Sequence, residues 1–335
     1  MHREESILNF GHDEALVGIL TQPGGDDVQA QVGCLLLNTG LNYRVGQRRI
    51  NVKLARRLAA SGIPALRFDM SGIGDSKPSS SPLDFRQQQL SDMRAALDAF
   101  QASTGLRHFL VFGVCSGAAN ALAVSLADRR VVGVLLFDGQ DFLGKRARVA
   151  RKLRLLLAFP FNAALRRQNA AWQDLKAWSR APMDVRARQR VFARLRRRSR
   201  AADDAGDKVF GTDGPVCTPA DYARDLQSLL DRGVDVYVMF SAMLHVADNH
   251  MDMLAQVRGQ PCLERIRYRF WPDIDHTATL LDAQQRLLDA VDAWAVEVAQ
   301  RSCMSAPARA QAPPPRSTRP HGQVPDESIA ASRMS

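Results

Sequence analysis

The sequence predicts an α/β protein built on a mostly parallel, doubly wound sheet of about eight strands. Short apolar or β-branched runs alternate along the chain with longer helical patterns. The runs at 35–37 and 134–137 are apolar on both faces, as in central strands that helices cover from both sides. Apolar residues make up 46% of the 335 residues, which is enough for the core of a full-sized domain.

In chain order the expected strands are 6–10, 15–21, 32–38, 65–69, 109–113, 131–137, 234–240 and 265–271. The expected helices are 47–61, 84–103, 116–128, 219–232, 251–258 and 279–300. Strands that alternate with helices in this way pair in parallel through right-handed crossovers.

Several classes of protein are excluded by composition. No run approaches the ~18–20 uninterrupted apolar residues that a membrane-spanning helix needs. The first ten residues carry acids and lack the long apolar region of a secretory signal. The cysteines are odd in number and show no C-x-x-C spacing: Cys34, Cys115, Cys217, Cys262 and Cys303. This argues against disulfides and zinc, so we expect a soluble cytoplasmic protein.

The charge is unevenly distributed, which divides the chain. The formal net charge is +10. Residues 145–200 hold eighteen Lys and Arg against two acids, a local +16, so the rest of the chain is net acidic at −6. We therefore expect a first core part at 1–140, a basic helical cap at 141–218, and a second core part at 219–301. The Pro-rich segment 302–335 is expected to be a disordered tail.

The strongest local signal is FGVCSGAANAL at 112–122, where a strand ends and a helix begins. Gly113 and Gly117 flank Cys115 in the pattern small-x-nucleophile-x-small of a nucleophile elbow. Ser116 is the alternative nucleophile, but the β-branched Val114 would then fill a position that needs a small residue. We therefore favour Cys115, and the N-terminus of the following helix should lower its pKa.

Two further turns follow predicted strands. After 32–38 the chain reads NTGLNYRVG, and the backbone N–H of Gly40 or Leu41 is expected to join that of Ser116 in binding an oxyanion. After 65–69 it reads MSGIGDS, which lacks the Lys and the spacing of a phosphate-binding loop. This segment is better interpreted as a structural turn, and we expect no cofactor.

The remaining catalytic groups are expected downstream. His276 follows the last strand and is the candidate general base. Asp248, in the loop after the seventh strand, is the favoured acid to orient it, with Asp138 and Asp252 as alternatives. The two histidines and two aspartates between 245 and 252 also resemble a metal site, but we expect no metal there.

These ordered signals resemble the α/β-hydrolase superfamily over about residues 1–140 and 219–300: FDMSGIGDS, then GVCSG, then DHTATL. Together with NTGLNYRVGQRR they also resemble hydrolases found with bacterial exosortase and exopolysaccharide gene clusters, of the serine-aminopeptidase-like or thioesterase-like branch. The resemblance implies a nucleophile–acid–histidine triad. It departs from the usual pattern in having Cys115 in place of serine, as in dienelactone-hydrolase-like members.

We therefore expect an ester or thioester hydrolase that forms an acyl-enzyme on Cys115, with peptidase activity less favoured. The alternative is a non-catalytic or acyl-transferring member of the fold whose basic cap binds an anionic partner or a membrane surface. The expected substrate is a small-molecule or carrier-bound acyl group. The positive charge of the cap would attract an anionic substrate of this kind. No nucleic acid is expected, since no binding motif accompanies the basic stretch.

Overall fold

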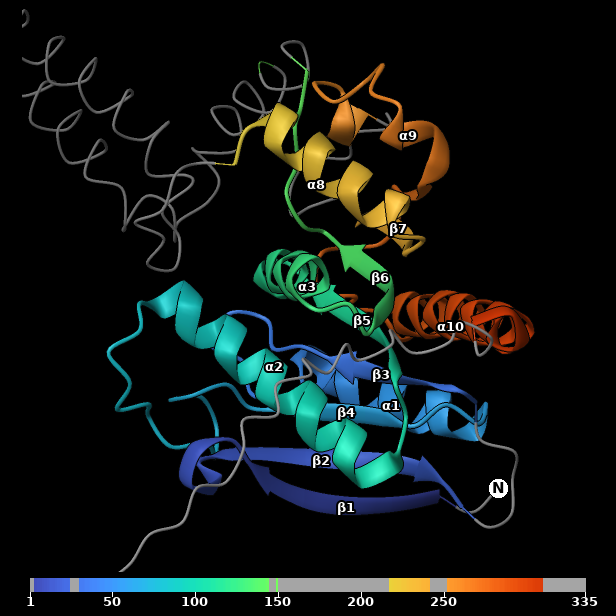
Figure 1. The fold of residues 1–335 in the computed structure, drawn as a ribbon. Helices are drawn as coiled ribbons and strands as arrows, with labels where there is room; N and C mark the ends of the chain where they lie inside the picture. Colours follow the sequence, from blue (N-terminus) through green and yellow to red (C-terminus); the bar gives the residue numbers. More distant parts are fainter. Residues whose placement is uncertain (1–2, 25–29, 145–148, 150–216, 242–251, 310–335) are drawn as a thin grey trace, which may run out of the picture.

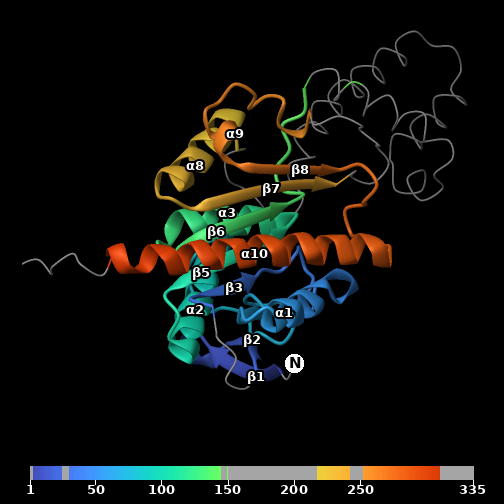
Figure 2. The same ribbon diagram turned by 90° about the vertical axis from the view of Figure 1, so that its right-hand side faces the viewer.

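The computed structural model describes residues 3–24, 30–144, 149, 217–241 and 252–309. Its centre is an eight-stranded sheet in the order β1-β2-β4-β3-β5-β6-β7-β8 (Figures 1 and 2). The strands are β1 Arg3–Phe10, β2 Leu16–Pro23, β3 Val32–Leu36, β4 Ala65–Phe68, β5 His108–Val114, β6 Val131–Phe137, β7 Asp235–Ser241 and β8 Arg267–Trp271. All eight predicted strands are present.

The pairing of the strands confirms the predicted mostly parallel sheet. β2 pairs antiparallel with both β1 and β4, and every other pair, from β4 through β8, is parallel. The carboxyl ends of β3, β5, β6, β7 and β8 therefore meet at one edge of the sheet, which is where ligand sites of such folds lie.

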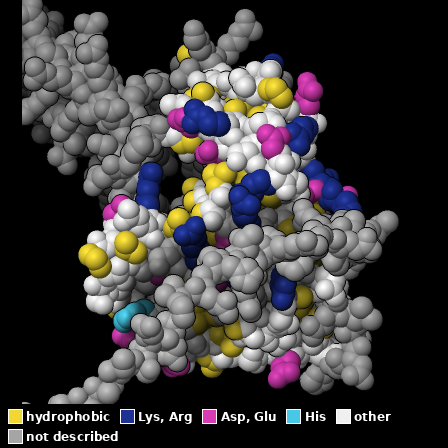
Figure 3. Space-filling model, in the orientation of Figure 1, with side chains coloured by type: hydrophobic (Ala, Val, Ile, Leu, Met, Phe, Trp, Pro, Cys, Tyr) yellow, Lys and Arg dark blue, Asp and Glu magenta, His cyan; other side chains and the backbone are white. Residues whose placement is uncertain are grey.

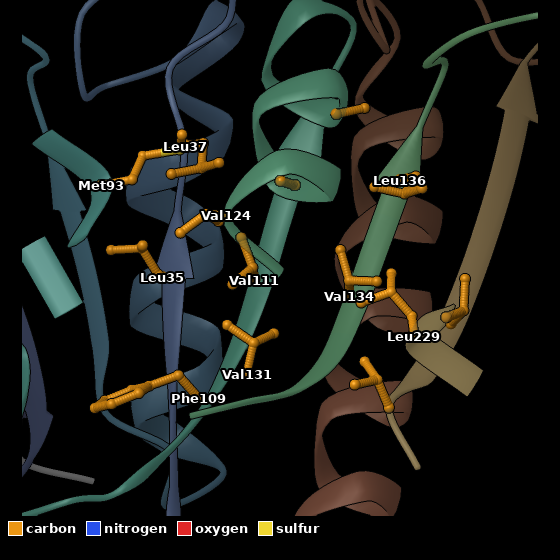
Figure 4. Close-up of a cluster of buried hydrophobic side chains, with 14 of the residues drawn as sticks. Leu35, Leu37, Met93, Phe109, Val111, Val124, Val131, Val134, Leu136 and Leu229 are labelled. Carbon is orange, nitrogen blue, oxygen red and sulfur yellow. The ribbon is translucent and has the colours of Figure 1, made fainter. Parts of the chain in front are cut away.

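Two helical layers cover the sheet (Figures 1 and 2). Helices α1 (Ile50–Ala60) and α10 (Leu281–Arg309) pack on one face, whereas α2 (Phe85–Thr104), α3 (Ser116–Ala127) and α8 (Pro219–Asp231) pack on the other. The strand pleat sorts neighbouring residues: Leu36 faces the α1/α10 layer and Leu35 the opposite layer. Figure 4 shows the hydrophobic core between the sheet and the α2/α3/α8 layer. There Val111 and Val134 of the sheet pack with Val124 of α3 and Leu229 of α8.

Two helices differ from the prediction by more than a few residues. The helix expected at 251–258 is only a 3-10 turn, η3 (Asp252–Leu254), followed by turns and by α9 (Cys262–Arg265). Backbone groups there bond to a neighbouring segment instead of forming a helix: Met253 O accepts from Phe142 N–H, and Gln256 N–H donates to Phe142 O. Helix α10 also continues to Arg309, past its expected end at residue 300 and into the predicted tail.

Most of the predicted cap and tail, at 150–216 and 310–335, lies outside the described residues. On the described surface, Lys and Arg side chains occur singly among acidic ones in the view of Figure 3. Within the part of the chain that the structure describes, no helix is both long and apolar enough to cross a membrane.

Candidate active site

Cys115 lies in the turn between β5 and α3, with φ 57° and ψ −119°. A positive φ is strained for a residue with a side chain, and it is the conformation of a strand-to-helix nucleophile elbow. A Cβ at Gly113 would lie 2.0 Å from the carbonyl oxygen of Gly117, and a Cβ at Gly117 would lie 2.5 Å from that of Asn38. The structure thus places Cys115, not Ser116, at the apex of the elbow.

His276 approaches Cys115 from the loop between β8 and α10. Its ring hydrogen-bonds the Cys115 thiol, and its Nδ1 lies 2.9 Å from Oδ2 of Asp138. The His276 side chain is 16% exposed and that of Asp138 is fully buried. Cys115, His276 and Asp138 therefore form one chain of hydrogen bonds at the carboxyl edge of the sheet.

The structure brings Asp138, the alternative acid from the sequence, to His276, whereas the sequence favoured Asp248. Asp138 directly follows β6, its N–H donates to Met239 O on the neighbouring strand β7, and its φ of 48° turns the chain there. The carboxylate at His276 Nδ1 is thus the one held as an alternative. Asp248 lies outside the described residues, and Asp252 begins the η3 turn.

A residue that sequence reasoning missed supports this carboxylate. Ser241, the last residue of β7, is fully buried. Its N–H donates to Oδ1 of Asp138 at 2.6 Å, and its hydroxyl donates to Oδ2. With His276, three donors converge on Asp138. The available signal was a polar residue that ends an otherwise apolar strand, VYVMFS.

The electrostatics favour an ion pair between Cys115 and His276. The hydrogen bond that His276 donates to Asp138, followed by its hydrogen bond with Cys115, raises the pKa of His276 from 6.5 to about 10. In turn the hydrogen bond with His276 lowers the pKa of Cys115, and the Ser116 N–H adds to this effect, against desolvation. Both shifts favour a thiolate beside an imidazolium, which is the reactive form of a cysteine nucleophile.

The predicted oxyanion donors show one unexpected contact. The Gly40 N–H donates to the Ser116 hydroxyl oxygen at 2.7 Å, so in this structure that amide is already engaged. Leu41, the alternative donor, is 78% exposed. The Ser116 N–H bonds the Cys115 side chain, and its role as an oxyanion donor stays a prediction.

Three carboxylates hold the loops that carry these groups. Asp275 accepts from the Thr279 N–H at 2.7 Å and from the Thr279 hydroxyl, which closes the loop around His276. In the loop after β3, the Arg44 N–H and guanidinium bond the buried Asp69, and the guanidinium also pairs with Asp75 at 2.5 Å. These bonds fix the MSGIGDS segment to the loop that contains Gly40, so that segment is a structural turn beside the site.

Seven non-glycine residues in the described part of the chain have a positive φ, and three of them lie in this site: Cys115, Asp138 and Ala278, which is two residues after His276. Strain of this kind persists where the surrounding structure enforces it, most often at functional sites. Among the residues that the structure describes, no cluster of three or more His, Cys, Asp or Glu could hold a metal ion. Most of the stretch 245–252, where the sequence resembles a metal site, lies outside them.

The elbow, the histidine after the last strand and the eight-stranded sheet define the class of protein. A family model described as "alpha/beta hydrolase fold" matches residues 35–278. The chain belongs to the α/β-hydrolase fold family and is a hydrolase. No curated protein matches it significantly.

Solved structures show the same fold at low sequence identity. Proline iminopeptidase of Mycobacterium smegmatis is 17% identical with a TM-score of 0.54, and the match covers 89% of this chain and 100% of that one. The esterase Pf2001 of Pyrococcus furiosus is 12% identical with a TM-score of 0.52, over 89% of this chain and 91% of that one. The narrower resemblance to exosortase-associated hydrolases is not tested by these matches and stays a prediction.

Proposed function

We propose that this protein hydrolyses an ester or a thioester through an acyl-enzyme on Cys115. The observation that carries the proposal is the series of contacts Cys115–His276–Asp138, in which His276 lowers the pKa of the Cys115 thiol and the buried Asp138 carboxylate holds the His276 ring. Three side chains connected in this way also support an enzymatic function over a purely scaffolding function of the fold.

In the first half-reaction the Cys115 thiolate attacks the acyl carbonyl carbon, and the carbonyl π electrons move to its oxygen. As the tetrahedral intermediate collapses, His276 Nε2–H protonates the leaving alcohol or thiol. The product is a thioester on Cys115 and a neutral His276 whose Nδ1–H still donates to Asp138.

The second half-reaction needs His276 as a base. Acylation removes the thiolate, one of the two hydrogen-bond partners that raise the pKa of His276, so that pKa falls in the acyl-enzyme. The neutral ring can then take a proton from water while the water oxygen attacks the thioester. Collapse expels the Cys115 thiolate, releases the carboxylic acid and restores the ion pair.

The nucleophile favours esters and thioesters over amides. A thiolate is a better leaving group than an amine, so a tetrahedral intermediate formed on an amide reverts unless its nitrogen is protonated in time. The Pyrococcus furiosus relative is an esterase, which is consistent with this substrate class; the mycobacterial relative is an iminopeptidase. An anionic acyl carrier and contact of the basic segment with a membrane stay proposals.

The test is intact-protein and peptide mass spectrometry after incubation with short acyl thioesters and acyl nitrophenyl esters. We expect an acyl adduct on Cys115 and turnover that Cys115→Ala abolishes. Cys217→Ala is the matched control, because Cys217 is also partly exposed but desolvation raises its pKa. An adduct on Ser116, or equal activity of the wild type and Cys115→Ala, would overturn the proposal.

A further inference from the structure

The Ser116 side chain makes a contact that the reaction outlined above does not use. Ser116 is the first residue of α3, directly after Cys115. Its hydroxyl oxygen accepts the Gly40 N–H at 2.7 Å across 76 positions of sequence. The loop after β3 is therefore bonded to the elbow through this side chain.

A serine hydroxyl has one donor and two acceptor lone pairs. Gly40 occupies an acceptor position, and among the residues that the structure describes the Ser116 O–H donates to no protein acceptor. The side chain is only partly buried, so a substrate can reach it. The same residue directs its backbone N–H at the Cys115 sulfur. One donor of Ser116, its N–H, thus bonds the reacting sulfur, and the hydroxyl is a second donor on the same residue.

We propose that the Ser116 hydroxyl is a side-chain donor of the oxyanion hole, with the Gly40 N–H holding its oxygen in place. This inference rests on the proposed acyl-enzyme chemistry. The hydroxyl keeps its proton throughout and donates a hydrogen bond to the oxygen that gains charge in the tetrahedral intermediate. Gly40 then acts indirectly, because a bond accepted by Oγ polarises the O–H and strengthens it as a donor.

A competing arrangement gives Gly40 the direct role. In it, the substrate oxygen displaces Ser116 and takes the Gly40 N–H for itself, so that the hydroxyl only occupies the site at rest. The two arrangements predict opposite effects of removing the hydroxyl: a slower reaction if it donates, and an unchanged or faster one if it blocks.

The experiment compares Ser116→Ala with the equal-sized pair Ser116→Thr and Ser116→Val, which differ in the hydroxyl. Two rates are measured on Cys115 by rapid-quench mass spectrometry. Acylation by an acyl thioester passes through an oxyanion, whereas alkylation by iodoacetamide needs the thiolate alone. We expect Ser116→Ala and Ser116→Val to acylate about 10²–10³-fold more slowly, Ser116→Thr to stay within about tenfold of the wild type, and alkylation to change little in all three.

Acylation of Ser116→Ala at the wild-type rate or above would overturn the inference and assign the donor to Gly40. A parallel loss of acylation and alkylation in Ser116→Val but not Ser116→Thr would also overturn it, since the hydroxyl would then act on the thiolate. Failure of the wild type to form any acyl adduct on Cys115 would instead reject the proposed function itself.

Discussion

Replacing Asp138 with Asn tests the contacts among Cys115, His276 and Asp138 at the most buried of the three residues. The carboxylate accepts from the Ser241 N–H, the Ser241 hydroxyl and His276 Nδ1. Asn keeps the shape but offers one acceptor oxygen and an NH₂ group that can only donate. Whichever way the amide turns, at least one of the three donors faces another donor. If that donor is His276 Nδ1–H, the ring adopts the opposite tautomer.

The size of the effect follows from the pKa of His276. Its rise from 6.5 to about 10 corresponds to about 5 kcal/mol in favour of the imidazolium, at about 1.4 kcal/mol per pKa unit. The Asp138 hydrogen bond is the largest cause, and a bond to a charged group contributes about 1.5–3 kcal/mol, or about 10- to 150-fold in rate. A wrong tautomer can extend the loss to about 10⁴. We therefore expect kcat/KM of Asp138→Asn to fall by a factor of between about 10 and 10⁴.

Stability should change with pH in a defined direction. Because folding raises the pKa of His276, the linked stabilisation is fully present below pH 6.5 and is lost as pH rises through about 10. The difference in free energy of unfolding between the wild type and Asp138→Asn should therefore be largest near pH 6 and shrink toward pH 10. Urea titrations at several pH values measure it.

The activity assay is steady-state hydrolysis of an acyl thioester at pH 7.5. Asp248→Asn and Asp252→Asn are the matched controls, since the sequence favours the first and allows the second. We expect both to keep most of their activity. Retention of activity in Asp138→Asn, together with a large loss in Asp248→Asn, would refute the reasoning. The carboxylate that orients His276 would then be Asp248, in the loop after β7.

Three further outcomes are expected. Ser241→Ala should lower kcat/KM about tenfold and the free energy of unfolding by about 1–3 kcal/mol, because a bond to the Asp138 carboxylate is lost; unchanged values in both assays would contradict this. Gly117→Ala should destabilise the fold by roughly 1–3 kcal/mol in urea unfolding, since its Cβ would lie 2.5 Å from Asn38 O; a more stable variant would disprove the steric argument. Iodoacetamide alkylation of Cys115 should follow a pKa below the thiol's usual 9.0, and a midpoint at or above 9.0 would exclude the ion pair.

Much of the fold could be predicted because its signals are local. Strand and helix periodicity depend on residues a few positions apart, and the elbow depends on glycines two positions either side of Cys115. The helix expected at 251–258 failed for a non-local reason. Its backbone groups bond to Phe142, more than a hundred residues earlier, and no window of sequence shows that competition.

The acid could not be predicted for the same reason. β6 and β7 are neighbouring parallel strands, with Phe137 beside Met239, so residues just beyond either strand lie at the same edge of the sheet. The sequence therefore offers an acid after either strand, and the preference for Asp248 rested on the pattern of similar proteins.

What distinguishes Asp138 is a backbone conformation and the contacts that stabilise it. Its φ of 48° costs of order 1–2 kcal/mol for a residue with a side chain. Two donors from Ser241 and one from His276 offset that cost, and each exists only once β7 and the loop after β8 have docked beside β6. The left-handed turn, the serine at the end of β7 and the carboxylate on His276 are thus mutually dependent. A substitution at Ser241 should consequently change the orientation of the His276 ring without direct contact between the two residues, because it changes the position of Asp138.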